Sequence, residues 1–134
     1  MRYVKEGYKF SELTGRIIGC AMRVHSALGN GFREVIYQKA LQIEMAEAGL
    51  AFSREQEMPV FYKGQKVGSR RVDFLVGSVV AVELKAVFRL EDAHYAQAIS
   101  YLEAYDLEVG LLLNFGARSL QVKRIGNPRY MDKD

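Results

Sequence analysis

The chain has 134 residues, about half of them hydrophobic and a quarter charged, which suits one ordinary globular domain and is too short for two. No uncharged apolar run approaches the ~20 residues of a membrane-spanning helix, and the first residues lack the apolar core of a signal peptide. A single cysteine, Cys20, excludes an internal disulfide and favours a reducing, cytoplasmic setting. The net charge of +3 permits contact with nucleic acid without demonstrating it.

Two helices are expected first along the chain. Apolar residues recur at helical spacing over residues 11–28, where Ser11 can cap the start and Gly29-Asn30-Gly31 ends the helix. A second helix is expected over residues 33–48, and it stops at Gly49.

The remainder of the chain predicts mainly strands. Strands are expected at residues 52–62, 66–76, 79–88, 109–115 and 120–125, with a third helix at residues 92–105. Pro59 indicates an edge strand or a bulge. The strand–helix–strand order from 79 to 115 predicts a right-handed parallel crossover, and the preceding hairpin adds antiparallel strands. We therefore expect a single α/β domain, a mixed sheet flanked by helices, with a core at about residues 11–125 and a loose tail at 126–134.

Charged residues interrupt the two central strands. Side chains on a strand alternate faces, so Glu83 and Lys85 share a face, and two charges on a buried strand need a partner or a ligand. A two-residue turn would place Asp73 and Glu83 on opposite faces. A three-residue loop from Gly77 to Val79 sets them opposite each other, and Gly77 can supply the positive φ that such a loop or a bulge requires.

Two adjacent carboxylates repel, so they need a shared proton or a cation. Mg²⁺ and similar cations prefer oxygen ligands, and a nearby lysine is placed to act on water or phosphate. An acid followed about ten residues later by Glu-x-Lys, here Asp73 and Glu83-Leu84-Lys85, resembles the core of the PD-(D/E)XK nucleases.

Further blocks of sequence resemble one group within that superfamily, the GxxExxY family. The resemblance spans roughly residues 13–125 and rests on Val24-His25-x-x-Leu28-Gly29, Gly31-x-x-Glu34-x-x-Tyr37, Tyr62-Lys63-Gly64, Asp73, Val82-Glu83-Leu84-Lys85-Ala86, Gln97 with Tyr101-Leu102, and Gly110 to Gly116. Asn30 stands where members of the family often carry proline.

The resemblance implies metal-dependent hydrolysis of phosphodiester bonds. Its catalytic residues would be Glu34, Asp73, Glu83, Lys85 and Gln97. Its ligands for Mg²⁺ or Mn²⁺ would be Asp73, Glu83, the Leu84 carbonyl and Glu34, with His25 as a further candidate. Its substrate-binding residue would be Tyr101. Arg71 and Arg89 are further substrate-binding candidates because they belong to a group of basic residues that surrounds the site in the sequence.

Structural alternatives stay open for several of these residues. Glu34 also suits the first turn of a helix, where an acid complements the helix dipole. His25 lies on a helix face, where a structural role is common. Gln97 and Tyr101 could instead contact solvent and the sheet.

Alternatives also remain for the protein as a whole. One is a nucleic-acid-binding accessory module with weak or no turnover, and another is an interaction domain in which Glu83 and Lys85 form only a salt bridge. The expected partner is nucleic acid, DNA rather than RNA, with no membrane, and a homodimer is compatible with the short chain. The sequence leaves open whether the substrate is single- or double-stranded and whether cleavage is internal or from an end.

Overall fold

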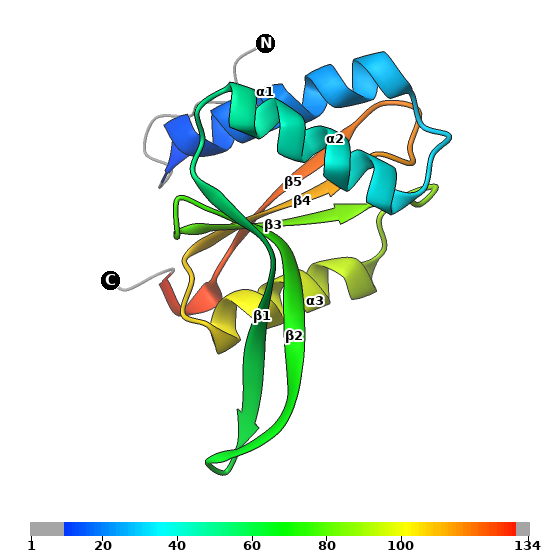
Figure 1. The fold of residues 1–134 in the computed structure, drawn as a ribbon. Coiled ribbons are helices and arrows are strands. Elements are labelled where there is room, and N and C mark those ends of the chain that lie inside the picture. The colour runs from blue at the N-terminus through cyan, green and yellow to red at the C-terminus, as the bar shows by residue number, and fades with distance from the viewer. Residues whose placement is uncertain (1–9, 131–134) are drawn as a thin grey trace.

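The computed structural model describes residues 10–130, and residues 1–9 and 131–134 lie outside this range. The elements follow one another as α1 (Ser11–Leu28), α2 (Glu34–Glu47), β1 (Phe52–Tyr62), β2 (Gln65–Val76), β3 (Val80–Lys85), α3 (Asp92–Ala104), β4 (Val109–Asn114), β5 (Gln121–Gly126) and the short 3-10 helix η1 (Pro128–Tyr130) (Figure 1).

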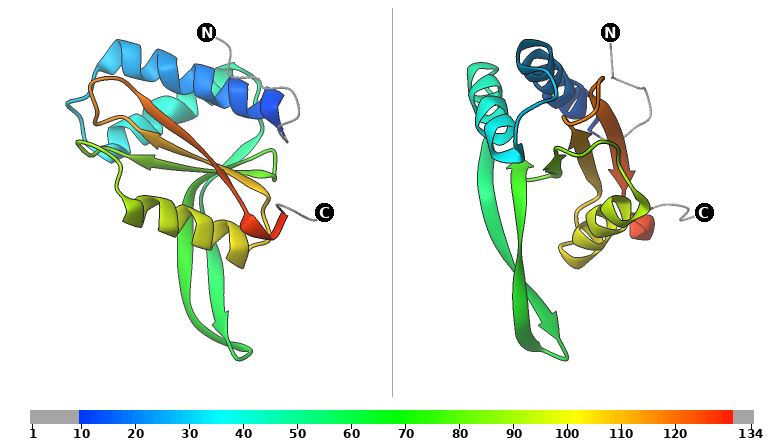
Figure 2. Two further views of the ribbon diagram at one scale, coloured as in Figure 1. Left: turned by 180° about the vertical axis from the view of Figure 1, so that it is seen from behind. Right: turned by 90° about the vertical axis from the view of Figure 1, so that its right-hand side faces the viewer.

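The five strands form one mixed sheet in the order β1-β2-β3-β4-β5. Strands β3 and β4 run parallel because α3 connects them across one face, and every other neighbouring pair is antiparallel. Helices α1 and α2 cover one face and α3 covers the other, as the views from behind and from the side also show (Figure 2). The α/β class and the mixed sheet flanked by helices are thereby confirmed, and β1, which carries Pro59, is an edge strand as expected.

Helix α1 ends as predicted but begins differently. Gly29 has a φ of 74° and donates its N–H to the His25 carbonyl, which closes the last turn. Ser11 makes no cap, because it is already the first helical residue and Phe10 occupies the position before it. Instead the Thr14 hydroxyl donates to the Ser11 carbonyl at 3.2 Å.

Two hydrophobic clusters lie on opposite faces of the sheet. The larger packs α1 and α2 against β3 and β4 through residues such as Ile17, Leu41 and Leu84, all fully buried. The smaller packs α3 through Leu102 and its neighbours. Among residues 10–130, no helix has the length and apolar character required to cross a membrane.

Strand β3 is shorter than predicted and ends at Lys85 rather than at residue 88. After Lys85, the buried Asn114 side chain replaces the backbone hydrogen-bond partners of the sheet. Its Oδ1 accepts the N–H groups of Val87 and Gly116, both at 3.0 Å. Its Nδ2 donates to Gln121 Oε1 at 2.7 Å. One amide therefore sets the course of the chain directly after Lys85.

Residues 126–130 were expected in a loose tail, but they pack onto the fold. Gly126 belongs to β5, and Asn127 is fully buried. Its amide donates to the carbonyls of Leu102 (3.0 Å) and Leu107 (2.8 Å), which satisfies backbone acceptors at and just after the end of α3. The remaining predicted tail, residues 131–134, lies outside the described residues.

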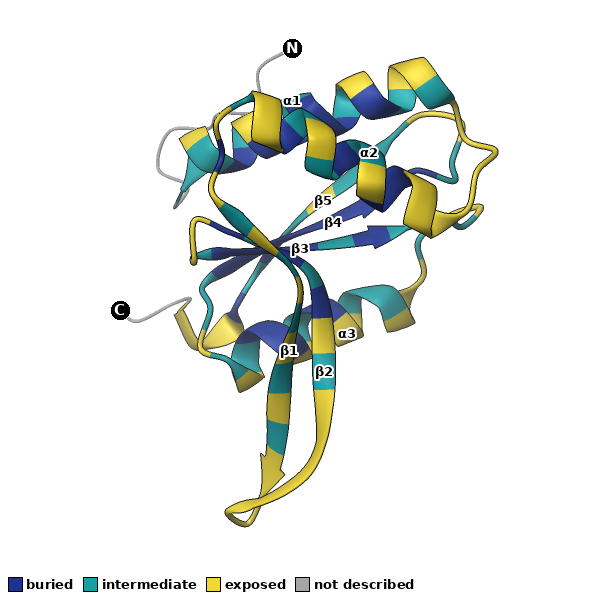
Figure 3. Ribbon diagram, viewed as in Figure 1, coloured by how far each residue is buried: buried dark blue, intermediate teal, exposed yellow. Residues whose placement is uncertain are grey.

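Strands β1 and β2 are about twice as long as the other three and continue beyond the sheet as a two-stranded ribbon. We call residues 59–69 of this ribbon the arm. It projects past α3, and its outer part is solvent-exposed on both faces (Figure 3).

Gly116 provides a test of the packing after β3. A Cβ at this position would lie 2.5 Å from the backbone N and O of Val87, so Gly116→Ala should lower the free energy of unfolding by roughly 1–3 kcal/mol, measured by urea denaturation. Gly68→Ala is the matched control, because a Cβ there meets nothing within 4 Å. Equal stability of the two variants would contradict the close approach.

Candidate active site

The candidate site forms where β2 and β3 separate. The pairing of Val76 with Val80 encloses a three-residue loop, and Gly77 has a φ of 60°, as the parity argument predicted. The ladder then ends at the pair Phe74–Val82, one step before Asp73 and Glu83 would pair. Asp73 Oδ2 instead accepts the backbone N–H of Leu84 at 2.7 Å, so a carboxylate replaces the missing backbone partner. Asp73 is thereby fixed at the fork between the strands.

Three carboxylates interact electrostatically at this fork. Burial raises the pKa of Asp73, although the Leu84 N–H and Lys85 oppose the rise. Burial also raises the pKa of Glu83, and the charges of Asp73 and Glu34 add to it. Glu34, in the first turn of α2, is exposed on one side, and partial desolvation together with the charge of Asp73 raises its pKa. The fork thus brings together two predicted acids from the sheet and one from α2.

Lys85 supplies positive charge to the same group. It lies two residues after Glu83 on β3, and its charge lowers the pKa of all three carboxyls. The structure therefore gathers Glu34, Asp73, Glu83 and Lys85 within electrostatic reach of one another.

Tyr37 explains how Glu34 is held at the fork. Its hydroxyl donates to the Gly29 carbonyl at 2.6 Å and accepts the Phe32 N–H at 3.1 Å, which fixes the loop that leads into α2. Its buried ring stacks on Phe115 with a centroid separation of 4.8 Å. The tyrosine of the Gly-x-x-Glu-x-x-Tyr pattern thus supports the helix start that carries the glutamate.

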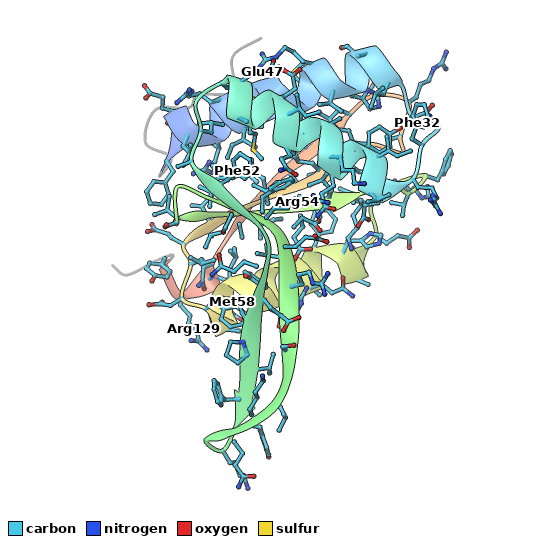
Figure 4. The ribbon with its side chains drawn as sticks, viewed as in Figure 1. Phe32, Glu47, Phe52, Arg54, Met58 and Arg129 are labelled. Atoms are coloured by element: carbon cyan, nitrogen blue, oxygen red, sulfur yellow. The ribbon has the colours of Figure 1, made fainter. Side chains whose placement is uncertain are left out.

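Gln38 is a site residue that the sequence analysis missed. It is buried, and its Nε2 donates to Asp73 Oδ1 at 3.2 Å, so both Asp73 oxygens are held. Arg54 of β1 donates to Gln38 Oε1 at 3.1 Å and to Gln42 at 3.0 Å, in the gap between β1 and α2 (Figure 4). The spacing of Gln38 four residues after Glu34, one turn along the same helix face, is the signal that could have indicated it.

Arg70, rather than its neighbour Arg71, contacts the acids. Its Nη2 lies 3.5 Å from Glu83 Oε1, and its Nη1 donates to the Gln97 carbonyl at 3.0 Å. Arg71 points to the other side of the ribbon, where it pairs with Glu55 and Glu57. Adjacent strand residues face opposite sides, so only one of two consecutive arginines reaches the site.

Helix α3 presents its predicted residues differently from expectation. The side chain of Gln97 is exposed. Tyr101, which was expected to face nucleic acid, is only 1% exposed, and its ring lies 5.6 Å from the Arg70 guanidinium carbon. Its buried hydroxyl has no hydrogen-bond partner, and burial together with Tyr105 and Glu83 raises its pKa to about 12. Because the helix packs on the sheet, Tyr101 supports Arg70 from beneath instead of meeting solvent.

The remaining candidates lie apart from the carboxylates' contacts. His25 Nε2 is 3.0 Å from the Ala117 carbonyl oxygen, and its ring is tilted against Phe115. His94 accepts the Glu91 N–H and so serves the start of α3. Arg89 is exposed in the segment between β3 and α3. None of these three makes a contact that ties it to Asp73 or Glu83 in residues 10–130.

The donor set suits a hard divalent cation. All candidate ligand atoms are oxygens, the kind that Mg²⁺ and Mn²⁺ prefer. Burial raises the pKa of both Asp73 and Glu83, and the charge of Asp73 raises that of Glu83 further. No group of three or more His, Cys, Asp or Glu side chains among residues 10–130 is arranged to hold a metal ion. The Asp73–Glu83 pair would therefore depend on water or on a backbone carbonyl to complete the coordination.

Comparisons with known proteins bear on the family and the fold. A family model described as the PD-(D/E)XK nuclease superfamily matches residues 11–125. The crystal structure of SSO0001 is similar in fold, with a TM-score of 0.56 and 18% sequence identity. The similarity covers 89% of this chain and 59% of that one. No curated protein matches the chain.

The pKa of Glu83 leads to a prediction about stability. Because the folded state raises this pKa, the ionised side chain destabilises the fold, and the stability that protonated Glu83 provides is lost as pH rises through its folded pKa. Without metal at pH 7, Glu83→Gln should therefore raise the Tm by a few degrees, and the gain should shrink as pH falls. Glu57→Gln removes an exposed acid from β1 and should show no gain. A lower Tm for Glu83→Gln at pH 7 would contradict the proposed electrostatics.

A second prediction concerns the shared cation. Isothermal titration with Mn²⁺ should detect binding in the unmutated protein, because a cation relieves the repulsion between Asp73 and Glu83. The double variant Asp73→Ala, Glu83→Ala should lose that binding. A control with Glu57→Ala and Glu103→Ala has the same net charge and should retain it. Equal binding by both double variants would show that the cation lies elsewhere.

Proposed function

Because the chain belongs to the PD-(D/E)XK nuclease superfamily, we propose that it is a metal-dependent nuclease that hydrolyses phosphodiester bonds of nucleic acid. The observation that carries the proposal is the fork, where Asp73 accepts the Leu84 N–H and lies within reach of Glu83, Glu34 and Lys85. Asp73, Glu83 and Lys85 match the aspartate and the Glu-x-Lys of the superfamily's name, and Val72 stands where that name has proline.

A divalent cation would be held by Asp73, Glu83 and the Leu84 carbonyl, and Glu34 would bind the same ion through water or help to hold a second one. When bound, Mg²⁺ or Mn²⁺ would act as a Lewis acid toward a phosphate oxygen and would stabilise the developing negative charge. Gln38 and the Leu84 N–H hold the Asp73 carboxylate in place, so that little reorganisation is required when phosphate enters.

Lys85 would position the attacking water. In the hydrolysis the water gives up a proton to solvent and its oxygen forms a bond to phosphorus, the bridging P–O bond breaks, and the leaving oxygen takes up a proton. A lysine ammonium beside the carboxylates can donate to the water or to a nonbridging oxygen while the charge on phosphate grows. Lys85 thus serves the transition state more than the ground state.

Arg70 is the basic side chain best placed to receive the substrate. Its guanidinium lies 3.5 Å from Glu83, a long ion pair that it could exchange for a phosphate oxygen. The ring of Tyr101 packs beneath the guanidinium. The exposed Gln97 and Arg89 would line the approach to the fork. Arg71, paired with Glu55 and Glu57, would contact substrate only from the other side of the ribbon.

We further propose that the chain is a GxxExxY-type member, acts on DNA rather than RNA and works in a reducing, cytoplasmic setting. Support comes from Tyr37 and Glu34, whose contacts give that pattern a structural reason, and from the buried free thiol of Cys20. A homodimer is compatible with the short chain. The similarity to the crystal structure of SSO0001 covers only 59% of the length of that chain.

One experiment addresses the reaction class directly. Purified protein is incubated with single- and double-stranded DNA and RNA, in Mn²⁺ and in EDTA. Cleavage that requires Mn²⁺ and disappears in Asp73→Asn supports the nuclease. Tight binding without cleavage of any substrate would instead favour an accessory binding module, an alternative supported by the Arg70–Glu83 ion pair and by the lack of a third ligand side chain in residues 10–130.

Lys85→Ala separates catalysis from binding. Loss of a lysine that acts on the water should lower the single-turnover cleavage rate by ~10²–10⁴-fold, yet leave substrate affinity in Ca²⁺ nearly unchanged. Lys123→Ala, an exposed lysine on β5, is the matched control and should cleave normally. If Lys85→Ala lost affinity and cleavage in equal proportion, the lysine would be a ground-state phosphate contact.

A further inference from the structure

The arm, residues 59–69, plays no part in the site described above, and its composition differs from that of the body. Between Glu57 and Asp73 the sequence contains no acidic residue, whereas it contains Lys63 and Lys66 at the tip and Arg70 and Arg71 at the base. The arginines are engaged with Glu83 and with Glu55 and Glu57. The net positive charge of the arm itself therefore comes from the two tip lysines.

Apolar side chains are also exposed on the arm. Phe61, Tyr62 and Val67 are 61%, 64% and 62% exposed, because the body of the fold does not cover them. Every residue from 61 to 69 is exposed (Figure 3), so no hydrophobic burial supports this part of the ribbon. Exposed aromatic groups gathered beside lysines indicate a surface that binds something.

The base of the arm is hydrogen-bonded to α3, and the tip projects away from the body of the fold. The Tyr105 hydroxyl, at the end of α3, donates to the carbonyls of Pro59 (2.8 Å) and Met58 (3.0 Å). Arg70 ties the other strand to the Gln97 carbonyl of the same helix. The outer part is closed by a two-residue turn at Lys63 and Gly64, both with positive φ. The arm is thus a ribbon anchored on α3 and free at its end.

We propose that the arm binds double-stranded nucleic acid beside the cleavage site, with the ribbon in a groove and its lysines on the phosphates. This inference rests on the proposed function and names the substrate class. The major groove of a duplex admits a two-stranded ribbon, and exposed aromatic groups at a tip can contact or wedge bases. Lys63 lies 5.6 Å from the Tyr62 ring centroid, so cation and aromatic group are presented together.

Other features of the arm disfavour a second copy of the chain as its occupant. Pro59 removes a backbone donor from the free edge of β1, and the ladder is irregular between Val60 and Phe61, two features that discourage strand addition. Two copies would also bring like charges, Lys63 and Lys66, together. Duplex phosphates offer the complementary charge.

The length of the arm fixes how far along the substrate it reaches. Nine residues separate Gly64 from Asp73, and a strand advances ~3.3 Å per residue, so the tip lies at most ~30 Å from the carboxylates. A duplex advances 3.4 Å per base pair, so the tip would meet it about nine base pairs from the scissile phosphate. The affinity for duplexes that end before this distance should not depend on the arm.

The test compares two arm variants with matched controls. Lys63→Ser, Lys66→Ser should reduce the slope of log affinity against log salt by about two for a long duplex, since each phosphate contact contributes about 0.9. Phe61→Thr, Tyr62→Thr should weaken binding roughly tenfold, because adjacent strand side chains face opposite sides and one of the two rings meets a base. The controls are Lys39→Ser, Lys123→Ser and Ile43→Thr, which alter exposed lysines and an exposed isoleucine elsewhere. Affinity is measured by fluorescence anisotropy in Ca²⁺, and unchanged Tm values show that each variant is folded.

Substrate length and strandedness provide the decisive comparison. Both arm variants should have the same affinity as the unmutated protein for a duplex of six base pairs and a lower affinity for a duplex of 24 base pairs. An equal loss on single strands would overturn the duplex assignment. A dimer that the Phe61→Thr, Tyr62→Thr variant converts to a monomer with unchanged affinity would make the arm a self-association surface.

The outcomes also distinguish this inference from the proposed function. If the protein cleaves with Mn²⁺ and the arm variants bind and cleave every length normally, the arm inference fails and the nuclease stands. If no substrate is cleaved but the arm variants lose affinity for long duplexes alone, the arm inference holds and the nuclease assignment fails.

Discussion

The hydrogen bond from the Leu84 N–H to Asp73 Oδ2 is the interaction on which the candidate site depends. A regular ladder would have used that N–H for a carbonyl of β2 and would have kept β2 beside β3. The carboxylate takes the carbonyl's place, so β2 can turn away into the arm while the buried donor stays satisfied. The same contact fixes an acid next to Glu83. The fork and the cluster of charges therefore have one cause.

The position of the acids could be predicted because it follows from counting. Strand parity fixes which residues face each other for a given loop length, and the three-residue Gly77–Val79 loop is the alternative that brings the two acids to one face. The general α/β arrangement follows similarly from strand–helix–strand order. The choice between Arg70 and Arg71 was not predictable in this way, because the separation of β2 from β3 alters which face of the ribbon meets the site.

Other site features depend on tertiary packing that a pattern does not contain. The burial of Tyr101 results from the way α3 lies on the sheet, and the role of Gln38 results from the approach of α2 to Asp73. The packing of Asn127 beneath the end of α3 made residues 126–130 part of the fold despite their tail-like composition. In each case a polar or aromatic residue gained its role from an element distant in sequence.

Helix α3 joins the two parts of the molecule that would meet a substrate. Through Tyr105 and the Gln97 carbonyl it holds both strands at the base of the arm, and the arginine bound to that carbonyl also touches Glu83. We therefore expect a ligand that tilts the arm to disturb the Arg70–Glu83 contact, and a group that displaces Arg70 to loosen the arm. Linkage requires the two effects to be equal in free energy. Binding at the arm and binding at the carboxylates would accordingly be coupled through α3.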